Sequence, residues 1–529
     1  MRYNPQSGSA EFDSAVSPNC IRRTPGTRPS LSQHSTIFCR FSVSKSFRFT
    51  TLRFSSRPAR PQRVRGWKLG VGRSLFAFSL GLHLSLPPAC STAQPVDPAR
   101  TSRAWEEAAR IVSRIKPPTF PRRDFPITQY GARRGSTNNC TDALRQAIAA
   151  CVRAGGGRVV VPAGEFFTGP IHLQSNVELH LEKDSVLKFV TNSSAYLPPV
   201  PTRFEGMECL NYSPPIYAYE QENVAITGEG TLDGQAGSDN WWRWKGRRAG
   251  APNHQPARER LVKMVEENLP VPQRRFGEGD FLRPSFVVFH RCRNLLIEGV
   301  RIRRSPMWEL HPLLCTNVTV RGVDIDSHGP NNDGCDPECC RDVLIEGCVF
   351  NTGDDCIAIK SGRNNDGRRV GLPCENVVVR GCTMKDGHGG VVIGSEISGG
   401  CRNVFAEDCD MDSPNLERLL RLKSNAVRGG AIENVFVRNI RVGQVSDAVL
   451  QIDFLYEEGA KGSYPPVARN VVMEGLTVQR APRVLNVAGF PGAEISGVRI
   501  YNSSFKAVEK PDALREAGDV RLVDCTFEH

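Results

Sequence analysis

Ionisable side chains recur at matching places in four successive segments of the chain. They are Asp333, Asp354, Asp355, His388, Arg421 and Lys423. Two carboxyl groups that face one cleft are the equipment of glycoside hydrolysis, one as general acid and the other as general base. An Asp in a Gly-rich turn is also typical of a solvated corner, so one such motif alone indicates no chemistry. Four successive segments with such groups favour a catalytic stripe over a series of corners.

These side chains can meet only if the segments that carry them are stacked. From about residue 220 a degenerate unit recurs, in which an Asn or Asp precedes alternating Val or Ile and a small residue. Its polar landmarks are Asn223, Asn294, Asn317, Asp342, Asn376, Asn403, Asn434 and Asn470. Their spacing from Asn294 onward varies between 23 and 36 residues, which a β-solenoid tolerates because extra residues become loops. We therefore expect an all-β fold, a right-handed parallel β-helix whose Asn amides hydrogen-bond from coil to coil.

The landmarks also predict that the ionisable groups face the same way. Counted from the landmark of its own unit, each group lies 12 to 18 residues on: Asp333, Asp354, His388 and Arg421. Adjacent strands are about 4.8 Å apart, so the groups would form a stripe within reach of one or two sugars. Thr352-Gly353 permits a turn that lets both Asp354 and Asp355 face this cleft.

Two segments outside the repeat are expected to shape the solenoid. Thr141 to Arg153 has the pattern of a short helix that ends before a run of glycines, and it predicts a cap for the open N-terminal end. Residues 234–285 interrupt the repeat and contain Trp241, Trp242 and Trp244. Long insertions in repeat proteins usually form functional loops. The tryptophans would either stack on sugars as a wall across one end of the cleft or pack against the flank of the solenoid.

The formal net charge of +12 is concentrated at the N-terminus. Residues 1–73 hold fourteen Lys or Arg and two acidic residues, so the rest of the chain has as many acidic as basic groups. A neutral body removes the composition argument for a nucleic-acid-binding domain.

We divide the chain into three parts. Residues 1–93 are a disordered leader with a signal-like segment at 64–93, residues 94–124 an N-terminal extension, and residues 125–529 the parallel β-helix catalytic domain. A basic stretch, a short apolar run and small residues are the parts of a secretory signal. The apolar run is shorter than the roughly 20 residues that span a bilayer. A secreted or periplasmic protein is favoured, with no stable membrane association beyond a signal or anchor; a transit-like segment is the alternative.

The cysteines indicate packing rather than metal binding. Several follow a charged or small residue at equivalent places in the repeat: Cys348, Cys382, Cys409 and Cys525. Free cysteine behaves as a small hydrophobe, which suits a buried position. No pair of cysteines is combined with a second pair or with spaced histidines, so we expect no zinc site.

Four motifs together resemble glycoside hydrolase family 28, the polygalacturonase family. They are Asn331-Asn332-Asp333, Gly353-Asp354-Asp355, Gly387-His388-Gly389 and Arg421-Leu422-Lys423. These are similar to the family's Asn-Thr-Asp, Gly-Asp-Asp, Gly-His-Gly and Arg-Ile-Lys elements and follow in the same order. The resemblance covers roughly residues 125–529. It departs from the pattern at Asn332, which replaces Thr, and at Leu422, which replaces Ile.

The resemblance implies a role for each matching residue. Asp354 would be the general acid, while Asp333 and Asp355 would position and deprotonate the attacking water in an inverting mechanism. Because three clustered carboxyl groups do not all ionise easily, one is expected to keep a proton near neutral pH. His388 would tune or share that proton. Asn331 would orient the catalytic groups, and Arg421 with Lys423 would bind the carboxylate of a uronate sugar.

The implied activity is hydrolysis of α-1,4-galacturonosyl linkages in pectin or polygalacturonate, with an acidic polysaccharide or oligogalacturonide as substrate. The resemblance implies no metal and no other cofactor. The insertion at 234–285 and the long segment from Lys360 to Pro373 favour attack from chain ends, since loops on a solenoid face form walls. The alternatives are a rhamnogalacturonan or xylogalacturonan hydrolase, a pectate lyase-like β-helix, and a carbohydrate-binding solenoid without activity.

Overall fold

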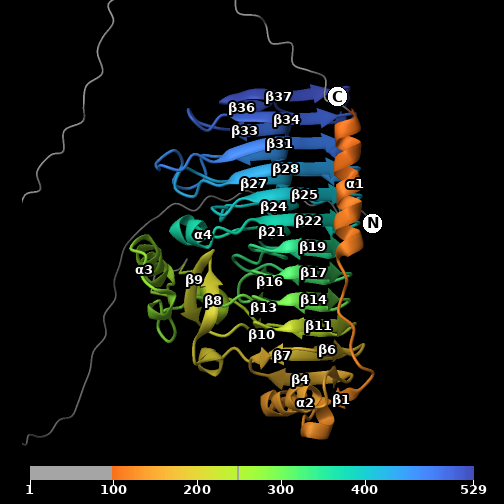
Figure 1. Ribbon diagram of the computed structural model, residues 1–529, viewed down its shortest axis with the longest axis vertical. Helices are drawn as coiled ribbons and strands as arrows, with labels where there is room; N and C mark the ends of the chain where they lie inside the picture. Colours follow the sequence, from red (N-terminus) through yellow and green to blue (C-terminus); the bar gives the residue numbers. More distant parts are fainter. Residues whose placement is uncertain (1–97, 247–249, 529) are drawn as a thin grey trace, which may run out of the picture. The chain divides into compact units, whose positions relative to one another are not determined.

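The computed structural model describes residues 98–246 and 250–528. The leader predicted for residues 1–93 lies outside this part of the chain. The described chain coils into a parallel β-helix with three sheets along its length (Figure 1). This confirms the expected fold class.

The first sheet has thirteen strands, all parallel to their neighbours. In sheet order they are β1 (Asp124–Pro126), β3 (Gly157–Val161), β6 (Val177–Leu181), β11 (Glu222–Gly228), β14 (Arg293–Glu298), β17 (Thr316–Arg321), β19 (Arg341–Glu346), β22 (Cys374–Arg380), β25 (Cys401–Glu407), β28 (Ala431–Arg438), β31 (Val467–Glu474), β34 (Ile495–Tyr501) and β37 (Ala517–Val523).

The second sheet has the same number of strands and follows the first around each coil. Its strands are β2 (Gly135–Asn139), β4 (Gly164–Thr168), β7 (Ser185–Phe189), β12 (Thr231–Asp233), β15 (Arg301–Arg303), β18 (Asp324–Ser327), β20 (Val349–Thr352), β23 (Thr383–Met384), β26 (Asp410–Met411), β29 (Arg441–Gln444), β32 (Thr477–Arg480), β35 (Ser504–Lys506) and β38 (Thr526–Glu528).

The third sheet is divided into two parts. The N-terminal part contains β5 (Ile171–His172), β10 (Ile216–Tyr219), β13 (Val287–His290) and β16 (Leu310–Leu313). The C-terminal part contains β21 (Ile357–Ile359), β24 (Val391–Ile393), β27 (Arg418–Lys423), β30 (Ala448–Asp453), β33 (Arg483–Ala488) and β36 (Ala513–Arg515). Single bridges from Cys335 to Leu310 and to Ile357 join the two parts.

Alternation of side chains explains why these short segments form strands. In β19, Val343 and Ile345 point into the solenoid and are fully buried, while Leu344 points outward. The same pattern repeats from coil to coil, so inward side chains stack into one continuous core. Cys348, Cys382 and Cys409 are unpaired and buried within it, which confirms their predicted packing role.

The predicted ladder of Asn side chains runs along the edge of the first sheet. Each Asn landmark adopts a positive φ, between 55° and 59°, a conformation that Asn tolerates well. Amide Nδ2 atoms donate to the Oδ1 atom of the preceding coil over 2.7 to 3.1 Å, from Asn223 to Asn470. The ladder is interrupted between Asn317 and Asp342, because an aspartate has no amide to donate. There Lys116 N donates to Asn317 Oδ1, and Arg114 Nη2 donates to Asp342 Oδ1.

The two anchors lie at the end of a helix that the sequence reading missed and two residues beyond it. Helix α1 (Pro98–Arg114) lies across the strands of the first sheet, on its outer face (Figure 1). Its residues Trp105, Ala108 and Ile111 pack against one outward side chain from each of five strands. These side chains are Leu344, Val378, Phe405, Phe436 and Val472. The helix therefore covers an apolar stripe that would otherwise face solvent. Within the described residues, no helix is long and apolar enough to cross a membrane.

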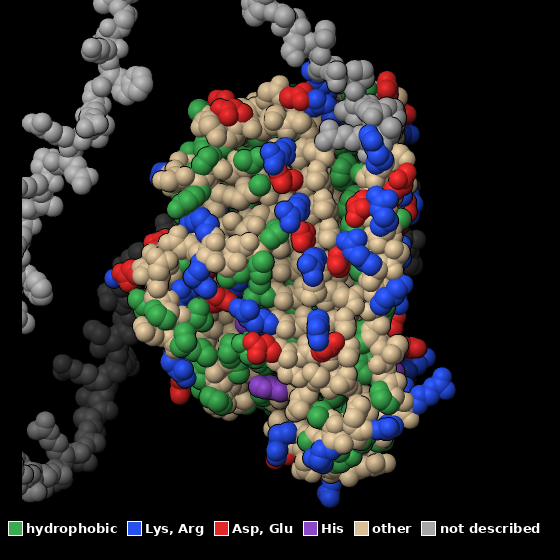
Figure 2. Space-filling model, viewed as in Figure 1, with side chains coloured by type: hydrophobic (Ala, Val, Ile, Leu, Met, Phe, Trp, Pro, Cys, Tyr) green, Lys and Arg blue, Asp and Glu red, His purple; other side chains and the backbone are tan. Residues whose placement is uncertain are grey.

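Helix α2 (Thr141–Arg153) has the predicted bounds and covers the N-terminal end of the core. Asn139, which precedes the N-cap residue Cys140, accepts a hydrogen bond at its Oδ1 atom from Thr141 N over 2.9 Å. The remaining short helices are η1 (Ile127–Tyr130), η2 (Ser193–Tyr196), η3 (Trp241–Trp244) and η4 (Val271–Gln273). On the face shown in Figure 2, acidic and basic side chains are interspersed, which agrees with the neutral body of the chain.

Long loops gather around the third sheet. An antiparallel hairpin, β8 (Val200–Phe204) and β9 (Met207–Asn211), and helix α3 (Gln255–Glu266) are inserted between strands of the second and third sheets. Helix α4 (Asn364–Val370) follows β21. In Figure 1 these elements project from the same flank of the solenoid.

Candidate active site

The turns that lead from the second to the third sheet bring the predicted residues together. Asp333 follows β18, Asp354 and Asp355 follow β20, and His388 follows β23, so the coil repeat stacks these turns. Arg421 and Lys423 lie on β27, the next strand of the third sheet. Direct contacts or a shared pocket connect all seven predicted site residues, including Asn331.

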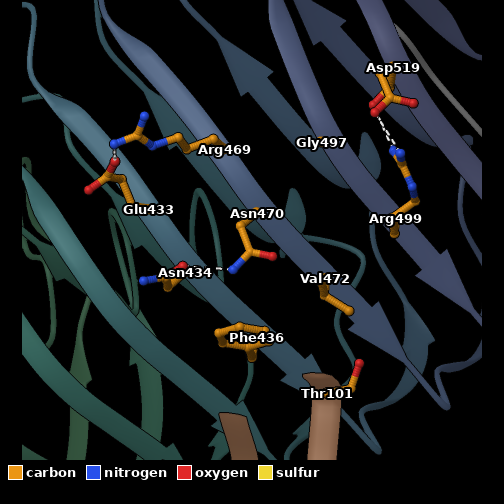
Figure 3. Close-up of a pocket in the computed structure, with 10 residues that line it drawn as sticks. All are labelled: Thr101, Glu433, Asn434, Phe436, Arg469, Asn470, Val472, Gly497, Arg499 and Asp519. Atoms are coloured by element: carbon orange, nitrogen blue, oxygen red, sulfur yellow. Dashed lines mark hydrogen bonds and ion pairs between the residues drawn. The ribbon is translucent and has the colours of Figure 1, made fainter. Parts of the chain in front are cut away.

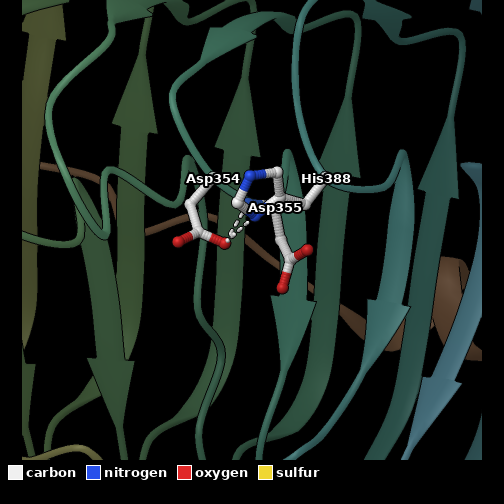
Figure 4. A group of neighbouring side chains, drawn as sticks. All are labelled: Asp354, Asp355 and His388. Carbon is white, nitrogen blue, oxygen red and sulfur yellow. Dashed lines mark hydrogen bonds and ion pairs between the residues drawn. The ribbon is translucent and has the colours of Figure 1, made fainter. Parts of the chain in front are cut away.

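Asp354 and His388 form a hydrogen-bonded pair (Figure 4). His388 Nδ1 lies 2.9 Å from Asp354 Oδ1. Burial alone would raise the pKa of Asp354, but the hydrogen bond from His388 and its positive charge lower it to about 2. The same hydrogen bond raises the pKa of His388 to about 8. In the unliganded protein the proton of this pair therefore resides on the imidazole.

Asp355 is fully buried and faces the two cationic side chains of β27. Lys423 Nζ lies 2.7 Å from Asp355 Oδ2, and Arg421 Nη1 lies 3.7 Å from Oδ1. Burial opposes the charge of Lys423, yet Asp355 raises the pKa of that ammonium. The two predicted uronate-binding residues therefore already share Asp355 as a carboxyl partner.

Asp333 lies at the base of the pocket beside a cation that the sequence reading did not single out. Lys360 Nζ lies 3.6 Å from Asp333 Oδ2, 3.5 Å from Asp336 Oδ1 and 3.3 Å from Glu396 Oε2. Burial, and then the charge of Asp354, raise the pKa of Asp333 well above its usual range. Burial and neighbouring negative charge therefore favour the protonated form of Asp333, and they raise the pKa of the neighbouring Asp336 in the same way.

The turn that carries Asp333 is fixed by its two asparagines. Asn332 is fully buried; its Oδ1 accepts from Gly329 N and from Ser327 Oγ, each over 2.7 Å, and its Nδ2 donates to Met307 O. Asn332, which stands where the family pattern has Thr, therefore fixes the turn to the preceding coil. Asn331 Oδ1 accepts from Arg283 Nη2 over 2.8 Å and from Lys245 Nζ over 3.0 Å.

A cavity of about 370 Å³ opens above these groups. Its lining combines Asn331, Asp333, Asp354, Lys360 and Lys423 with residues from the inserted loops, which are Glu205, Lys245, His254, Gln255, Arg258, Arg363, Glu396, Tyr456 and Glu457. The lining is predominantly polar, as a site for a charged sugar requires.

The insertion at 234–285 contributes to this cavity, but its tryptophans do not. Trp241 is 1% exposed and packs edge-on against Tyr196 and Trp244. Trp242 donates its Nε1 proton to Ser305 O. The interpretation that these rings stack on sugar is wrong, because their apolar faces fasten the insertion to the solenoid flank. Lys245, which directly follows them, reaches the cavity instead.

The β8–β9 hairpin covers the N-terminal part of the third sheet. Tyr217 Oη donates to Pro201 O over 2.6 Å, and His290 Nδ1 lies 3.2 Å from the same carbonyl. Arg203 Nη1 donates to Glu338 Oε1 over 2.6 Å, and both side chains are fully buried. Glu338 also contacts His311 on β16. The hairpin therefore closes the cleft on the N-terminal side of Asp333.

Asp354, Asp355 and His388 also qualify by distance as a cation site, since one ligand atom of each lies within 4.8 Å of the others. A cation there would compete with His388 for Asp354 and with Lys423 for Asp355. The contacts explain the cluster without a metal.

A second hollow, of about 520 Å³, lies beside Thr101 on the outer face of the first sheet (Figure 3). Its ionisable groups are paired with one another: Arg469 with Glu433, and Arg499 with Asp519. These pairs leave no aligned acid and base comparable to those of the first cavity.

Comparison with known proteins identifies related chains. The family model "Glycosyl hydrolases family 28" matches residues 278–510. The crystal structure of a hyperthermoactive exopolygalacturonase from Thermotoga maritima is 42% identical, with 80% of this chain and 96% of that chain covered and a TM-score of 0.78.

Two curated sequences are more distant. An exo-poly-alpha-D-galacturonosidase of Dickeya chrysanthemi is 24% identical over 444 residues, which cover 76% of this chain and 70% of the relative. A probable polygalacturonase of Vitis vinifera is 28% identical over 369 residues, which cover 67% and 68%.

Proposed function

The chain belongs to family 28 of the glycoside hydrolases, and on that premise we propose that it hydrolyses α-1,4-galacturonosyl linkages of polygalacturonate from the chain ends. The Thermotoga maritima and Dickeya chrysanthemi relatives are both described as exo-acting enzymes on this type of polymer. Their similarity extends over 80% and 76% of this chain, and the family model covers the four motifs.

The closure of the cleft by the hairpin supports the exo mode of action. The hairpin closes the cleft directly beside the catalytic carboxyl groups through the buried contacts of Pro201 and Arg203. A polymer passing through a cleft needs free space on both sides of the cleaved bond. A cavity of about 370 Å³ that is closed on one side instead accepts a chain end.

The reaction requires one proton donor and one acceptor. Asp354 acts as the donor, and it receives the proton from His388 through their 2.9 Å hydrogen bond as the substrate excludes water. Asp355, whose Oδ2 lies 2.7 Å from Lys423 Nζ, accepts a proton from the attacking water. Asp333 holds that water in place. A coupled cluster of this kind titrates as a unit, so the microscopic proton positions shift when a ligand binds.

Arg421 and Lys423 contact Asp355 and, in the complex, also bind the carboxylate of the substrate. Arg421 keeps donors free for a second partner, since its nearest contact to Asp355 is 3.7 Å. An arginine can offer two parallel hydrogen bonds to a uronate carboxylate, which favours galacturonate over a neutral sugar at this place.

Time-resolved product analysis on polygalacturonate tests the proposal. An exo-acting enzyme releases monomer or dimer from the first minutes, while the viscosity of the polymer falls slowly. Rapid loss of viscosity with a ladder of intermediate oligomers would overturn the exo mode. Cleavage of rhamnogalacturonan alone would contradict the substrate, and an unsaturated product that absorbs in the ultraviolet would indicate a lyase.

Export of the protein is a separate proposal, supported by the signal-like composition of residues 64–93. Detection of the protein in the medium or periplasm of producing cells supports it, and retention in the cytoplasm contradicts it.

A further inference from the structure

Most cations that line the active-site cavity are already paired with carboxylates of the protein. Arg258 Nε lies 2.6 Å from Glu205, and Arg363 contacts Glu205 and Glu396. Lys360 contacts Asp333, Asp336 and Glu396, and Lys423 contacts Asp355. These charges are balanced before any ligand arrives.

Lys245 is different. Its Nζ atom donates to Asn331 Oδ1 over 3.0 Å, and among the described residues no carboxylate oxygen lies within 4.0 Å of it. The side chain is half-buried, and burial lowers its pKa. An ammonium has three donors, so two remain available for a partner in the cavity. Glu205 and Asp354 act on Lys245 only from beyond contact distance. A half-buried cation with no carboxylate in direct contact is unfavourable, and a carboxylate ligand would relieve this cost.

The surroundings of Lys245 define where that ligand would lie. Glu205 belongs to the turn of the hairpin, His254 precedes α3, and both line the cavity with Lys245. They form its closed end. His254 is nearly fully buried, and burial lowers its pKa to about 3, so it adds no charge there near neutral pH. Glu205 directly contacts Arg258 and Arg363, so Lys245 is left without a direct ion pair at this end.

We propose that Lys245 binds the carboxylate of the sugar in the closed end of the cavity and makes the enzyme select an unesterified uronate at the chain terminus. The inference rests on the proposed exo-hydrolase function and adds a specificity determinant to it. A methyl ester carries no charge and leaves the ammonium unbalanced, so an esterified terminal sugar binds poorly. Lys245 lies in the insertion and outside the four motifs, which explains why the motifs gave no sign of it.

Steady-state kinetics on trigalacturonate and on its two singly methyl-esterified forms, with the ester on either terminal sugar, tests this inference. With the wild-type enzyme, one of the two esters lowers kcat/KM at least tenfold. Lys245→Gln keeps a donor for Asn331 but removes the charge. We expect it to lower kcat/KM for free trigalacturonate about 10- to 100-fold, the usual range for a hydrogen bond to a charged group, mainly through KM. On the ester that the wild-type enzyme disfavours, kcat/KM of Lys245→Gln stays near the wild-type value. The preference for free trigalacturonate over this ester therefore disappears.

Two matched variants complete the experiment. Lys245→Arg keeps the charge and restores most of the preference. Lys263→Gln removes an exposed cation from α3 in the same insertion and leaves both KM and preference unchanged. A Lys245→Gln variant that still prefers the free acid, or that loses activity on both substrates equally, would overturn the inference while leaving the hydrolase function intact. Failure of the wild-type enzyme to hydrolyse trigalacturonate would overturn both.

Discussion

The two parts of the third sheet have the same strand spacing but differ in what covers their outer faces. In the N-terminal part, outward side chains such as Tyr217 and His311 are sealed beneath the hairpin. In the C-terminal part, the column Arg421, Gln451 and Asn486 faces the cleft from neighbouring strands, and Arg421 and Asn486 keep contact with solvent. The regular solenoid thus supplies the floor, and the inserted loops alone make the cleft one-sided.

The difference extends to the charges. Beneath the hairpin, Arg203, Glu338 and His311 form a buried network that depends on each member. On the open side, the cationic side chains have room for a second, external partner. Four predictions test this contrast, and they are taken from the largest expected effect to the smallest.

The largest effect is expected at the boundary between the two parts. Asp354→Asn removes the proton donor but not the cationic side chains, so kcat falls about 10²- to 10⁴-fold while substrate affinity is retained. Turnover and the binding of trigalacturonate by calorimetry measure the two quantities. Asp412→Asn, which changes an exposed Asp two coils away, serves as the control. More than about a tenth of wild-type activity in Asp354→Asn would refute the assignment.

Arg203→Met tests whether the cover depends on its buried charges. The variant leaves Glu338, whose pKa is lowered to about 2, with His311 as its remaining close partner. Loss of one partner of a buried ion pair typically lowers the free energy of unfolding by about 3–5 kcal/mol. Urea denaturation measures it. Arg480→Met removes an exposed partner of Glu509 and should change stability by less than about 1 kcal/mol. Equal effects of the two variants would contradict the contrast.

On the open side, Arg421→Gln should raise KM for oligogalacturonides about tenfold or more, because it removes a charge-assisted contact to the substrate. Asn486→Ala, two strands further along, should weaken the binding of long oligomers but leave that of the dimer unchanged. KM values for a series of chain lengths provide the measurement. An identical response to both variants at every length would show that the open side does not hold successive sugars.

The smallest effect concerns pH. The pKa of His388 is raised from 6.5 to about 8, so its pairing with Asp354 contributes stability fully below about pH 6.5 and loses it as the pH rises through 8. In the wild type, kcat/KM should therefore decline with a midpoint near pH 8 on the basic side of the pH profile. His388→Gln should remove this limb and lower the rate severalfold at pH 6. A basic limb that persists in the variant would assign it to another group.

Features that follow from a repeated or local sequence pattern could be predicted from the sequence, whereas contacts between distant insertions could not. The Asn ladder and helix α2 follow from periodicity and turn chemistry. The hairpin has no repeat signature, and its energetics depend on Glu338, 135 residues from Arg203. Lys360 directly follows an ordinary β-strand, β21, so only the fold reveals its three acidic neighbours.

Two gaps in the sequence reading have identifiable causes. Helix α1 carried a usable signal, since Trp105, Ala108 and Ile111 recur at helical spacing in a segment treated as an extension. For Trp241 the choice between sugar stacking and flank packing stayed open, because an aromatic ring suits both a sugar and a core. Its partners Tyr196 and Tyr212 come from residues before the repeat region and were not visible as neighbours.

The interruption of the Asn ladder also limits where this solenoid can lengthen by gene duplication. At the regular rungs, each Asn donates a hydrogen bond from Nδ2 to the preceding coil and accepts one at Oδ1 from the next, so a duplicated coil finds matching partners above and below. Between Asn317 and Asp342 the helix end is anchored to both neighbouring coils through Lys116 and Arg114. An extra coil there would move these anchors about 4.8 Å further apart. Evolution can therefore add coils on either side of this rung, while the rung itself fixes the position at which the N-terminal helix docks.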